Sequence, residues 1–256
     1  RRLKVPALYI DDGFLPDVTV EDVIVEETRV QAIVQVRELL EEQREAKDSC
    51  FGAGKALLRV KRITATVENI IEQLLANRNL VVNLADVRSI DDYTFGHCVN
   101  VCVLSLITGI TLGYERERLL RLGLGAILHD LGKLDVPLQV LQKPGRLTAE
   151  EFALVKRHPE EGYRRVLRLP GVSAASAQVV YQHHERYDGS GYPRGLQGQG
   201  VHEMAYICGV ADVFDALTAD RVYRRACPVH EAYEMVAGSG NVLFDFRVVR
   251  ALLENV

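Results

Sequence analysis

Cysteines are few in this sequence, and their spacing excludes two classes of protein. There are five, an odd number, and no two of them form a Cys-x-x-Cys pair. We therefore expect neither the disulfide framework of a small secreted protein nor a zinc knuckle. Because free thiols are typical of a reducing compartment, we expect the protein to be cytoplasmic.

An excess of positive charge is also lacking. The 31 lysines and arginines and the 35 aspartates and glutamates give a formal net charge of -4. Without an overall basic field to attract phosphate backbones, a long nucleic acid is not an expected partner. Any anionic substrate must then be held by a local group of residues.

Two further features are missing. The chain begins at Arg1 without a charged-then-apolar leader, so we expect it to be a fragment of a longer protein. Charge of either sign is absent from residues 93–114, a length close to the roughly 20 residues that span a bilayer. This stretch contains polar residues such as His97 and Asn100, which favour a helix buried in a helical bundle over a membrane span.

The pattern of apolar residues predicts an all-α fold. Residues 5–20 contain a short strand-like group, which we interpret as the remnant of another domain. Apolar residues at three- and four-residue steps predict one helix over residues 21–47 and a second that ends near residue 79. We expect residues 1–90 to form an N-terminal segment and helical connector, which could also make a homodimer contact. Residues 91–256 are expected to form a bundle of further helices, separated by loops rich in Gly and Pro.

Histidine and aspartate gather beside apolar segments in the C-terminal half. His129-Asp130 follows residues 119–128, His183-His184 follows residues 179–181, and Asp212 follows residues 206–211. A single buried His-Asp pair is more often a structural hydrogen bond than a metal site. Three such segments, however, are explained more simply by one shared metal site, because buried charge is costly unless it is paired or metal-bound. Imidazole and carboxylate ligands together suit Fe, Mn or Zn.

Five motifs occur in an order that resembles the HD-GYP domain family. They are His129-Asp130-Leu131-Gly132-Lys133, Lys143-Pro144-Gly145-Arg146-Leu147-Thr148, His158-Pro159, His183-His184-Glu185-Arg186-Tyr187-Asp188-Gly189-Ser190-Gly191-Tyr192-Pro193 and Asp212-Val213-Phe214-Asp215-Ala216-Leu217-Thr218. The resemblance covers residues 91–256. It implies an HD-type helical bundle that holds two divalent metal ions and hydrolyses a cyclic dinucleotide, cyclic di-GMP above all, to pGpG, with further cleavage to GMP left open.

The resemblance also implies a set of site residues. The metal ligands would be His129, Asp130, His158, His183, His184 and Asp212; the catalytic residues Asp130 and Lys133; and the substrate contacts Lys133, Asp215, Arg221 and Arg224. Some members bind a third metal with an additional Glu, but Tyr93 stands at that position here. We therefore expect His97 to be either an optional third-metal ligand or a residue that supports the two-metal site. Fe or Mn is the favoured metal, with Zn, Co, Ni and Mg left open.

The chemistry of such a site agrees with phosphodiester hydrolysis. Two metal ions about 3.5–4 Å apart can bridge one water, lower its pKa and hold the attacking and leaving oxygens. Lys133 lies four residues after His129 and would project from the same helix face if the helix continued through Gly132. Tyr192 is expected to pack within its loop rather than against a base, and Cys98 and Cys102 to be buried apolar residues.

Two other functions stay open at this point. The chain could be a non-catalytic signalling module that responds to a cyclic dinucleotide or a metal through its N-terminal helices. It could also be an HD phosphohydrolase that acts on cyclic GMP-AMP or another nucleotide. The complete ligand set favours catalysis, because a module that only binds has no need to activate water.

Overall fold

The computed structural model describes residues 23–45, 53–77, 93–219 and 226–256, and every regular element in these residues is a helix. A single isolated β-bridge joins Gly240 and Phe244. The all-α prediction is confirmed. The strand expected within residues 5–20 lies outside the described residues.

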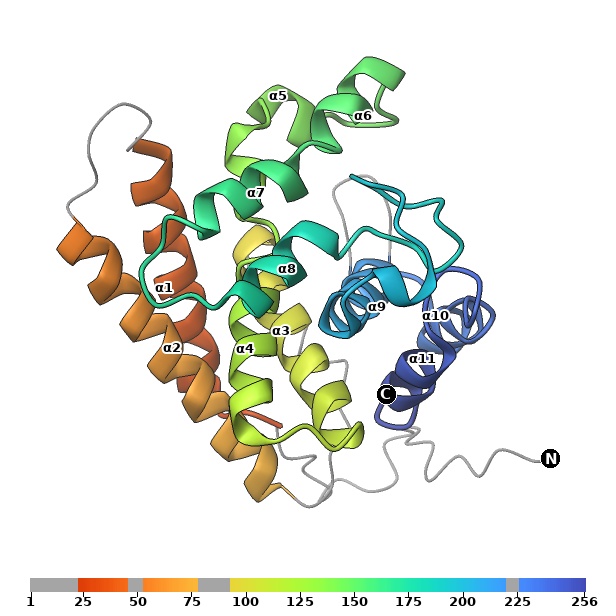
Figure 1. The fold of residues 1–256 in the computed structure, drawn as a ribbon, viewed down its shortest axis with the longest axis horizontal. Coiled ribbons are helices and arrows are strands. Elements are labelled where there is room, and N and C mark those ends of the chain that lie inside the picture. Colours follow the sequence, from red (N-terminus) through yellow and green to blue (C-terminus); the bar gives the residue numbers. More distant parts are fainter. Residues whose placement is uncertain (1–22, 46–52, 78–92, 220–225) are drawn as a thin grey trace, which may run out of the picture.

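The helices form a layered bundle (Figure 1). In chain order they are α1 (Glu26–Glu45), α2 (Ala53–Ala76), α3 (Tyr93–Thr111), α4 (Arg116–Ile127), the 3-10 helix η2 (Leu131–Asp135), α5 (Leu138–Leu141), α6 (Ala149–Val155), α7 (His158–Val166), α8 (Ala174–Gln182), the 3-10 helix η3 (Gly198–Gly200), α9 (Glu203–Thr218), α10 (Val229–Ala237) and α11 (Phe246–Leu253). The helices α3, α4, α8 and α9 pack against one another at the centre.

The two N-terminal helices form a hairpin at one edge of the bundle, against α3 and α4 (Figure 1). In α2, Ile63, Val67 and Ile70 recur at the predicted spacing and are almost wholly buried. The helix ends at Ala76, slightly before the expected residue 79. The apolar residues that predicted α1 do not all face the core. Val30 and Val34 are 46% and 43% exposed, whereas the others are buried.

The apolar core is continuous from the hairpin into the rest of the bundle. The expected boundary near residue 90 falls outside the described residues, so the division into two segments stays a prediction. The uncharged stretch forms α3, which packs against α1, α4 and α9, and both Cys98 and Cys102 are buried there. Among the described residues, no helix combines the length and the apolar character needed to cross a membrane.

The helix before the His-Asp pair ends close to the end of the apolar run over residues 119–128. It does not continue through Gly132, so the condition under which Lys133 would share a helix face with His129 is not met: α4 ends at Ile127 and residues 131–135 form the 3-10 helix η2. The N–H groups of His129, Leu131 and Lys133 bond to carbonyls three residues earlier, the tighter pattern of a 3-10 turn. This tight turn places His129 and Asp130 on a short segment at the bundle centre.

Candidate metal centre

All six predicted ligands lie in one region of the bundle, together with His97. His97 lies in α3, His129 and Asp130 between α4 and η2, His158 at the start of α7, His183 and His184 at the end of α8, and Asp212 in α9. The side chains of His129, His158 and His183 are at most 1% exposed. The ligands therefore come from five separate parts of the chain and meet in the interior.

Two glycines allow these segments to approach one another. A Cβ at Gly132 would overlap the carbonyl oxygen of His158 and lie 2.5 Å from the backbone nitrogen of Gly162. A Cβ at Gly209 in α9 would similarly overlap the carbonyl oxygen of His183. Backbone contact of this kind sets the distance between the His-Asp turn and α7, and between α8 and α9.

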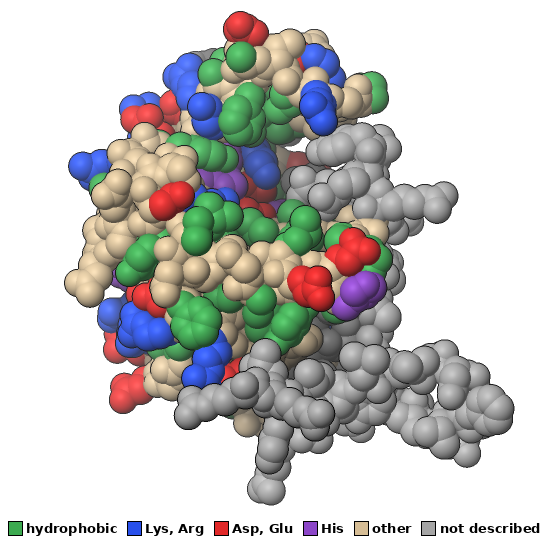
Figure 2. Space-filling view, turned by 90° about the vertical axis from the view of Figure 1, so that its right-hand side faces the viewer, with side chains coloured by type: hydrophobic (Ala, Val, Ile, Leu, Met, Phe, Trp, Pro, Cys, Tyr) green, Lys and Arg blue, Asp and Glu red, His purple; other side chains and the backbone are tan. Residues whose placement is uncertain are grey.

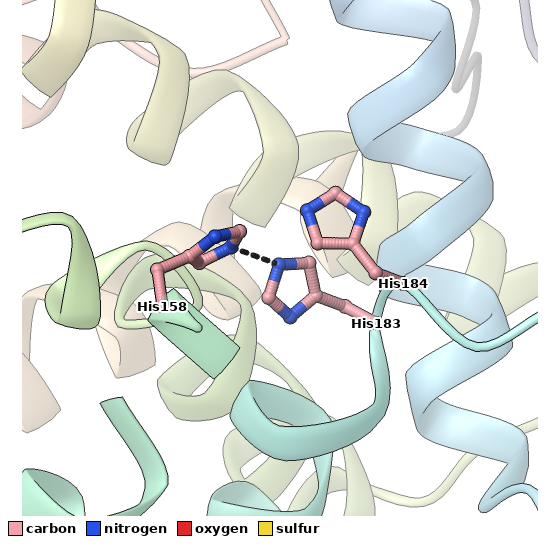
Figure 3. A group of neighbouring side chains, drawn as sticks. All are labelled: His158, His183 and His184. Atoms are coloured by element: carbon pink, nitrogen blue, oxygen red, sulfur yellow. Dashed lines mark hydrogen bonds between the residues drawn. The ribbon is translucent and has the colours of Figure 1, made fainter. Parts of the chain in front are cut away.

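Three histidines are oriented in the same way. The Nδ1 atoms of His129, His158 and His183 lie 2.7, 2.7 and 2.9 Å from the carbonyl oxygens of Ala126, Val155 and Val180, each three residues earlier. A carbonyl only accepts, so Nδ1 carries the proton and Nε2 keeps its lone pair. Figure 3 shows His158, His183 and His184 converging, and the Nε2 atoms of His158 and His183 are 3.2 Å apart.

The ligand atoms form two groups, each with its members within 4.8 Å of one another. The trihistidine group consists of His158, His183 and His184, and the mixed group consists of His97, His129 and Asp130. Asp130 connects them: its Oδ1 lies 3.5 Å from Nε2 of His158, and its Oδ2 lies 3.5 Å from Nε2 of His129. One carboxylate thus faces both groups.

The donor atoms fit divalent cations. Nε2 of His129 and Oδ1 of Asp130 are buried and make no hydrogen bond within the described residues. A buried polar atom without a partner is costly, and a coordinated cation would satisfy both atoms. Asp212 extends the mixed group, because its Oδ1 lies 3.2 Å from Nε2 of His97.

The charges of these ligands suit metal binding, which requires neutral imidazole and ionised carboxylate. Burial lowers the pKa of His158 to about 4 and also lowers the pKa values of His129, His183 and His184. The pKa of Asp130 lies well below its ordinary value despite burial, because Lys133 and the nearby histidines favour the carboxylate. The trihistidine group is therefore uncharged, and the carboxylate beside it is ionised.

His97 has a different environment. Burial alone would lower its pKa, but hydrogen bonds and the charges of Asp212 and Asp215 outweigh burial and raise the pKa to about 10. Its Nδ1 lies 2.6 Å from Oδ2 of Asp215, and its Nε2 faces Asp212. Its ligand atom thus lies within the mixed group. The sequence left open whether His97 is an optional third-metal ligand or a supporting residue, and its position between Asp212 and Asp215 is consistent with both roles.

Lys133 lies at the mouth of the centre. Its Nζ is 2.5 Å from Oδ2 of Asp130, and 31% of the side chain is exposed. The charges of Asp130 and Asp212 raise its pKa although burial opposes this, so the ammonium form is favoured. In Figure 2, histidine, acidic and basic side chains are visible at the bottom of a hollow.

The other expected substrate contacts divide into two cases. Arg221 and Arg224 lie outside the described residues. Asp215 is 1% exposed, and its two oxygens accept bonds from His97 and Asn100. This arrangement favours a role for Asp215 through His97 rather than on the substrate.

The loop after the two histidines packs against a ligand. Tyr192 stacks on His184 with ring centroids 4.6 Å apart, which agrees with packing within the loop rather than against a base. Both oxygens of the buried Glu185 accept backbone N–H bonds, from Arg194 at 2.8 Å and Leu196 at 2.9 Å. Glu185 therefore holds this loop in place.

Reasoning from the sequence gave no role to Glu185 or Asn100. Glu185 directly follows two predicted ligands and belongs to the same motif. Asn100 lies three residues after His97 in an uncharged stretch, which places both on one face of α3. A polar residue at that spacing from a candidate ligand was a usable signal for a supporting contact.

Comparison with known proteins relates these residues to a family. Residues 69–248 match the family model described as HD domain. A protein from Pseudomonas aeruginosa named cyclic di-GMP phosphodiesterase is 39% identical over 190 residues, which are 74% of this chain and 46% of that protein. A cyclic di-GMP phosphodiesterase response regulator from Xanthomonas campestris is 36% identical over 203 residues, 78% of this chain and 52% of the relative.

Two further similarities concern another substrate and the fold. A 3'3'-cGAMP-specific phosphodiesterase from Vibrio cholerae is 35% identical over 166 residues, 65% of this chain and 38% of that protein. This chain thus spans about half the length, or less, of these curated relatives. A solved structure from Bdellovibrio bacteriovorus, described as a HDG"Y"P protein, matches with a TM-score of 0.72 and 21% identity over 93% of this chain and 74% of that one. At this identity the match shows a shared fold.

Proposed function

The chain belongs to the HD domain family, and on this basis we propose that it is a metal-dependent phosphodiesterase of the HD-GYP type that hydrolyses cyclic di-GMP to linear pGpG. The order of the five motifs and the names of the relatives support this proposal. Further cleavage of pGpG to GMP is a separate reaction, which the experiment below also measures.

The position of Asp130 carries the proposal. The two oxygens of Asp130 face the trihistidine group and the mixed group, and Oδ1 has no hydrogen-bond partner in the described residues. Asp130 would therefore help to hold a cation at each of the two groups. When bound, two divalent ions supply Lewis acidity, which acidifies water and stabilises negative charge on phosphoryl oxygens.

The reaction adds one water across one P–O bond. The bond from phosphorus to a 3'-oxygen breaks, a new P–O bond forms to the water oxygen, and the 3'-oxygen takes up a proton. Lys133 is the proposed contact to a phosphate oxygen, and its partly exposed ammonium beside Asp130 supports this role. The histidines hold their Nε2 atoms fixed through carbonyl bonds, so little reorganisation is needed during the reaction.

Several finer features belong to the same proposal. Fe or Mn is the proposed metal, because the donor set combines imidazole and carboxylate without thiolate. A cytoplasmic location is supported by the buried thiols of Cys98, Cys102 and Cys208. We also propose a homodimer contact through α1 and α2, where Val30 and Val34 are exposed on the hairpin surface.

The first experiment is anaerobic purification with metal analysis, followed by chromatography of cyclic di-GMP digests with Fe or Mn supplied. We expect pGpG to form, and we expect the variants His129→Ala and Asp130→Ala to lose both bound metal and activity. His230→Ala is the matched control, because His230 is exposed on α10. Full activity in metal-free protein would contradict the proposal, and metal-loaded protein without turnover of any cyclic dinucleotide would favour a non-catalytic signalling module.

A second substrate is favoured by one comparison. The Vibrio cholerae relative is named as specific for 3'3'-cGAMP, so hydrolysis of cyclic GMP-AMP is the alternative function. Turnover of cyclic di-GMP, 3'3'-cGAMP and a mononucleotide phosphomonoester should be compared at equal concentration. A higher kcat/KM for cyclic GMP-AMP would change the substrate assignment and leave the metal centre as described. A preference for the phosphomonoester would replace the cyclic dinucleotide with another nucleotide.

A further inference from the structure

An arginine from the N-terminal hairpin is buried in the bundle. Arg29 of α1 is 2% exposed, and its Nη1 donates to Oδ1 of Asn100 at 3.3 Å. Its Nε lies 3.6 Å from a carboxylate oxygen of Glu26, and neither Nε nor Nη2 makes a hydrogen bond within the described residues. A buried guanidinium is costly unless its charge is compensated. Glu26 supplies one negative charge from the surface, and a second, buried carboxylate is reached through Asn100.

That path leads to the metal centre. The amide nitrogen of Asn100 donates to Oδ1 of Asp215 at 3.0 Å, and Oδ2 of Asp215 lies 2.6 Å from Nδ1 of His97. A guanidinium only donates and a carboxylate only accepts, so the amide can bond both neighbours in one orientation only. The buried charges of Arg29 and Asp215 are thus of opposite sign and are joined by one side-chain amide.

The path fixes the ring of His97. Because Asp215 accepts from Nδ1, Nε2 is the atom left to face Asp212 at 3.2 Å and Asp130 at 3.8 Å. A carboxylate behind a ligand imidazole orients the ring and increases its basicity. His129, by contrast, is oriented by a carbonyl three residues away, as His158 and His183 are. His97 instead depends on side chains from α9 and, through Asn100, from α1.

We propose that Arg29 is a positioning residue: through Asn100 and Asp215, α1 sets the orientation of His97 and thereby the affinity of the mixed group for a divalent cation. This proposal deepens the proposed function, on which it rests only in taking the centre to bind metal. A displacement of α1 against α3 would then change metal binding at the mixed group. The effect would pass through Asn100 and Asp215 and would not involve the trihistidine group.

The test is a titration of the metal-free 256-residue chain with Mn²⁺ by calorimetry, together with thermal unfolding. We expect Arg29→Met and Asp215→Asn each to weaken one class of Mn²⁺ site about 10- to 100-fold, the range found when a supporting partner of a ligand is lost. A second class, assigned to the trihistidine group, should keep its affinity. The double variant should bind no more weakly than Asp215→Asn alone, because both residues act along one path.

The matched control is Arg59→Met. Arg59 of α2 bonds Glu38 and Glu42 of α1, so its loss weakens the same hairpin without touching the path to His97. We expect a lower melting temperature and unchanged Mn²⁺ affinity. If Arg29→Met proves too unstable to titrate, Asn100→Leu interrupts the path one step later and should show the same loss.

The proposal would be overturned if folded Arg29→Met or folded Asp215→Asn bound Mn²⁺ with wild-type affinity. It would also be overturned if the two losses of Mn²⁺ affinity added in the double variant. No cyclic dinucleotide is present in the titration. A failure of the substrate assignment would therefore leave this result unaffected.

Discussion

The close approach of η2 to α7 gives a sharp test of the site geometry. In Gly132→Ala, the new Cβ would lie 2.5 Å from the nitrogen of Gly162 and closer still to the carbonyl oxygen of His158. Ordinary van der Waals contact begins near 3.4 Å, so the two segments must separate by about 1 Å or more. His158 and Asp130 would then move apart by a similar distance from their present 3.5 Å.

A shift of this size is large for a metal centre. Ligand distances tolerate about 0.2 Å, and a misplacement of about 1 Å in a reacting group can reduce turnover about 100-fold. Overpacking of this kind typically costs about 1–3 kcal/mol, which a folded domain can survive. We therefore expect Gly132→Ala to fold with a lower denaturation midpoint, to bind less metal and to lose at least about 100-fold in turnover.

The control for this test lies beside another residue of the centre. A Cβ at Gly96, next to His97, meets no described atom within 4 Å, and alanine is favoured over glycine in a helix by roughly 0.5–1 kcal/mol. Gly96→Ala should therefore keep its metal and its turnover. Denaturation with urea, metal analysis and steady-state kinetics on both variants check the prediction. Wild-type metal content and turnover in Gly132→Ala would show that the packing of η2 against α7 does not set the geometry.

Three further predictions concern single side chains. The pKa of His158 is about 4 in the folded protein and about 6.5 ordinarily, so the unfolded state binds more protons between these pH values. The free energy of unfolding of the metal-free protein should therefore fall by up to about 3 kcal/mol as the pH falls from 6.5 to 4. Urea unfolding at several pH values should show a smaller loss in His158→Gln, and equal losses in both proteins would refute this. Tyr192 stacks on His184, so Tyr192→Phe should keep activity. Tyr192→Ala should lose up to about 3 kcal/mol of stability together with bound metal. Thermal unfolding and metal analysis check both variants, and a strong effect of Tyr192→Phe would instead assign a role to the hydroxyl. Lys133→Met should retain both metals but reduce kcat/KM about 100-fold, because a charge aimed at the phosphate is lost; unchanged kinetics would place Lys133 outside the substrate site.

The sequence was most informative about helices with regular apolar spacing and about polar residues that follow an apolar run. Apolar spacing predicted α2 to within a few residues, and the motifs contain every residue of the two candidate metal groups except His97. His129 and Asp130 were readable because two polar residues at the end of a buried run are costly without a shared partner. The same reasoning predicts that the ligands are buried, that the ligand histidines are neutral and that the aspartates are ionised.

What the sequence did not show depends on contacts between distant segments. The bond from Asp215 to His97 joins residues 118 positions apart, and that from Arg29 to Asn100 joins residues 71 apart. Neither has a periodic signal, because periodicity reports only which face of one helix is apolar. The 3-10 turn after α4 has no periodic signal for a related reason: the tight turn at Gly132 is required by the backbone of α7, which belongs to another part of the chain.

The buried charges of the centre also indicate how metal and substrate binding are linked. In the protein alone, Asp130 faces the ammonium of Lys133, and His97 faces both Asp212 and the buried Asp215. A buried carboxylate needs such compensation from some source. A divalent cation held by Asp130 would supply this compensation, and the ammonium of Lys133 would then be available to a phosphate oxygen. We therefore expect a phosphodiester to bind more tightly to the metal-loaded protein than the charge of the metal alone would explain, and Lys133→Met to remove that additional affinity.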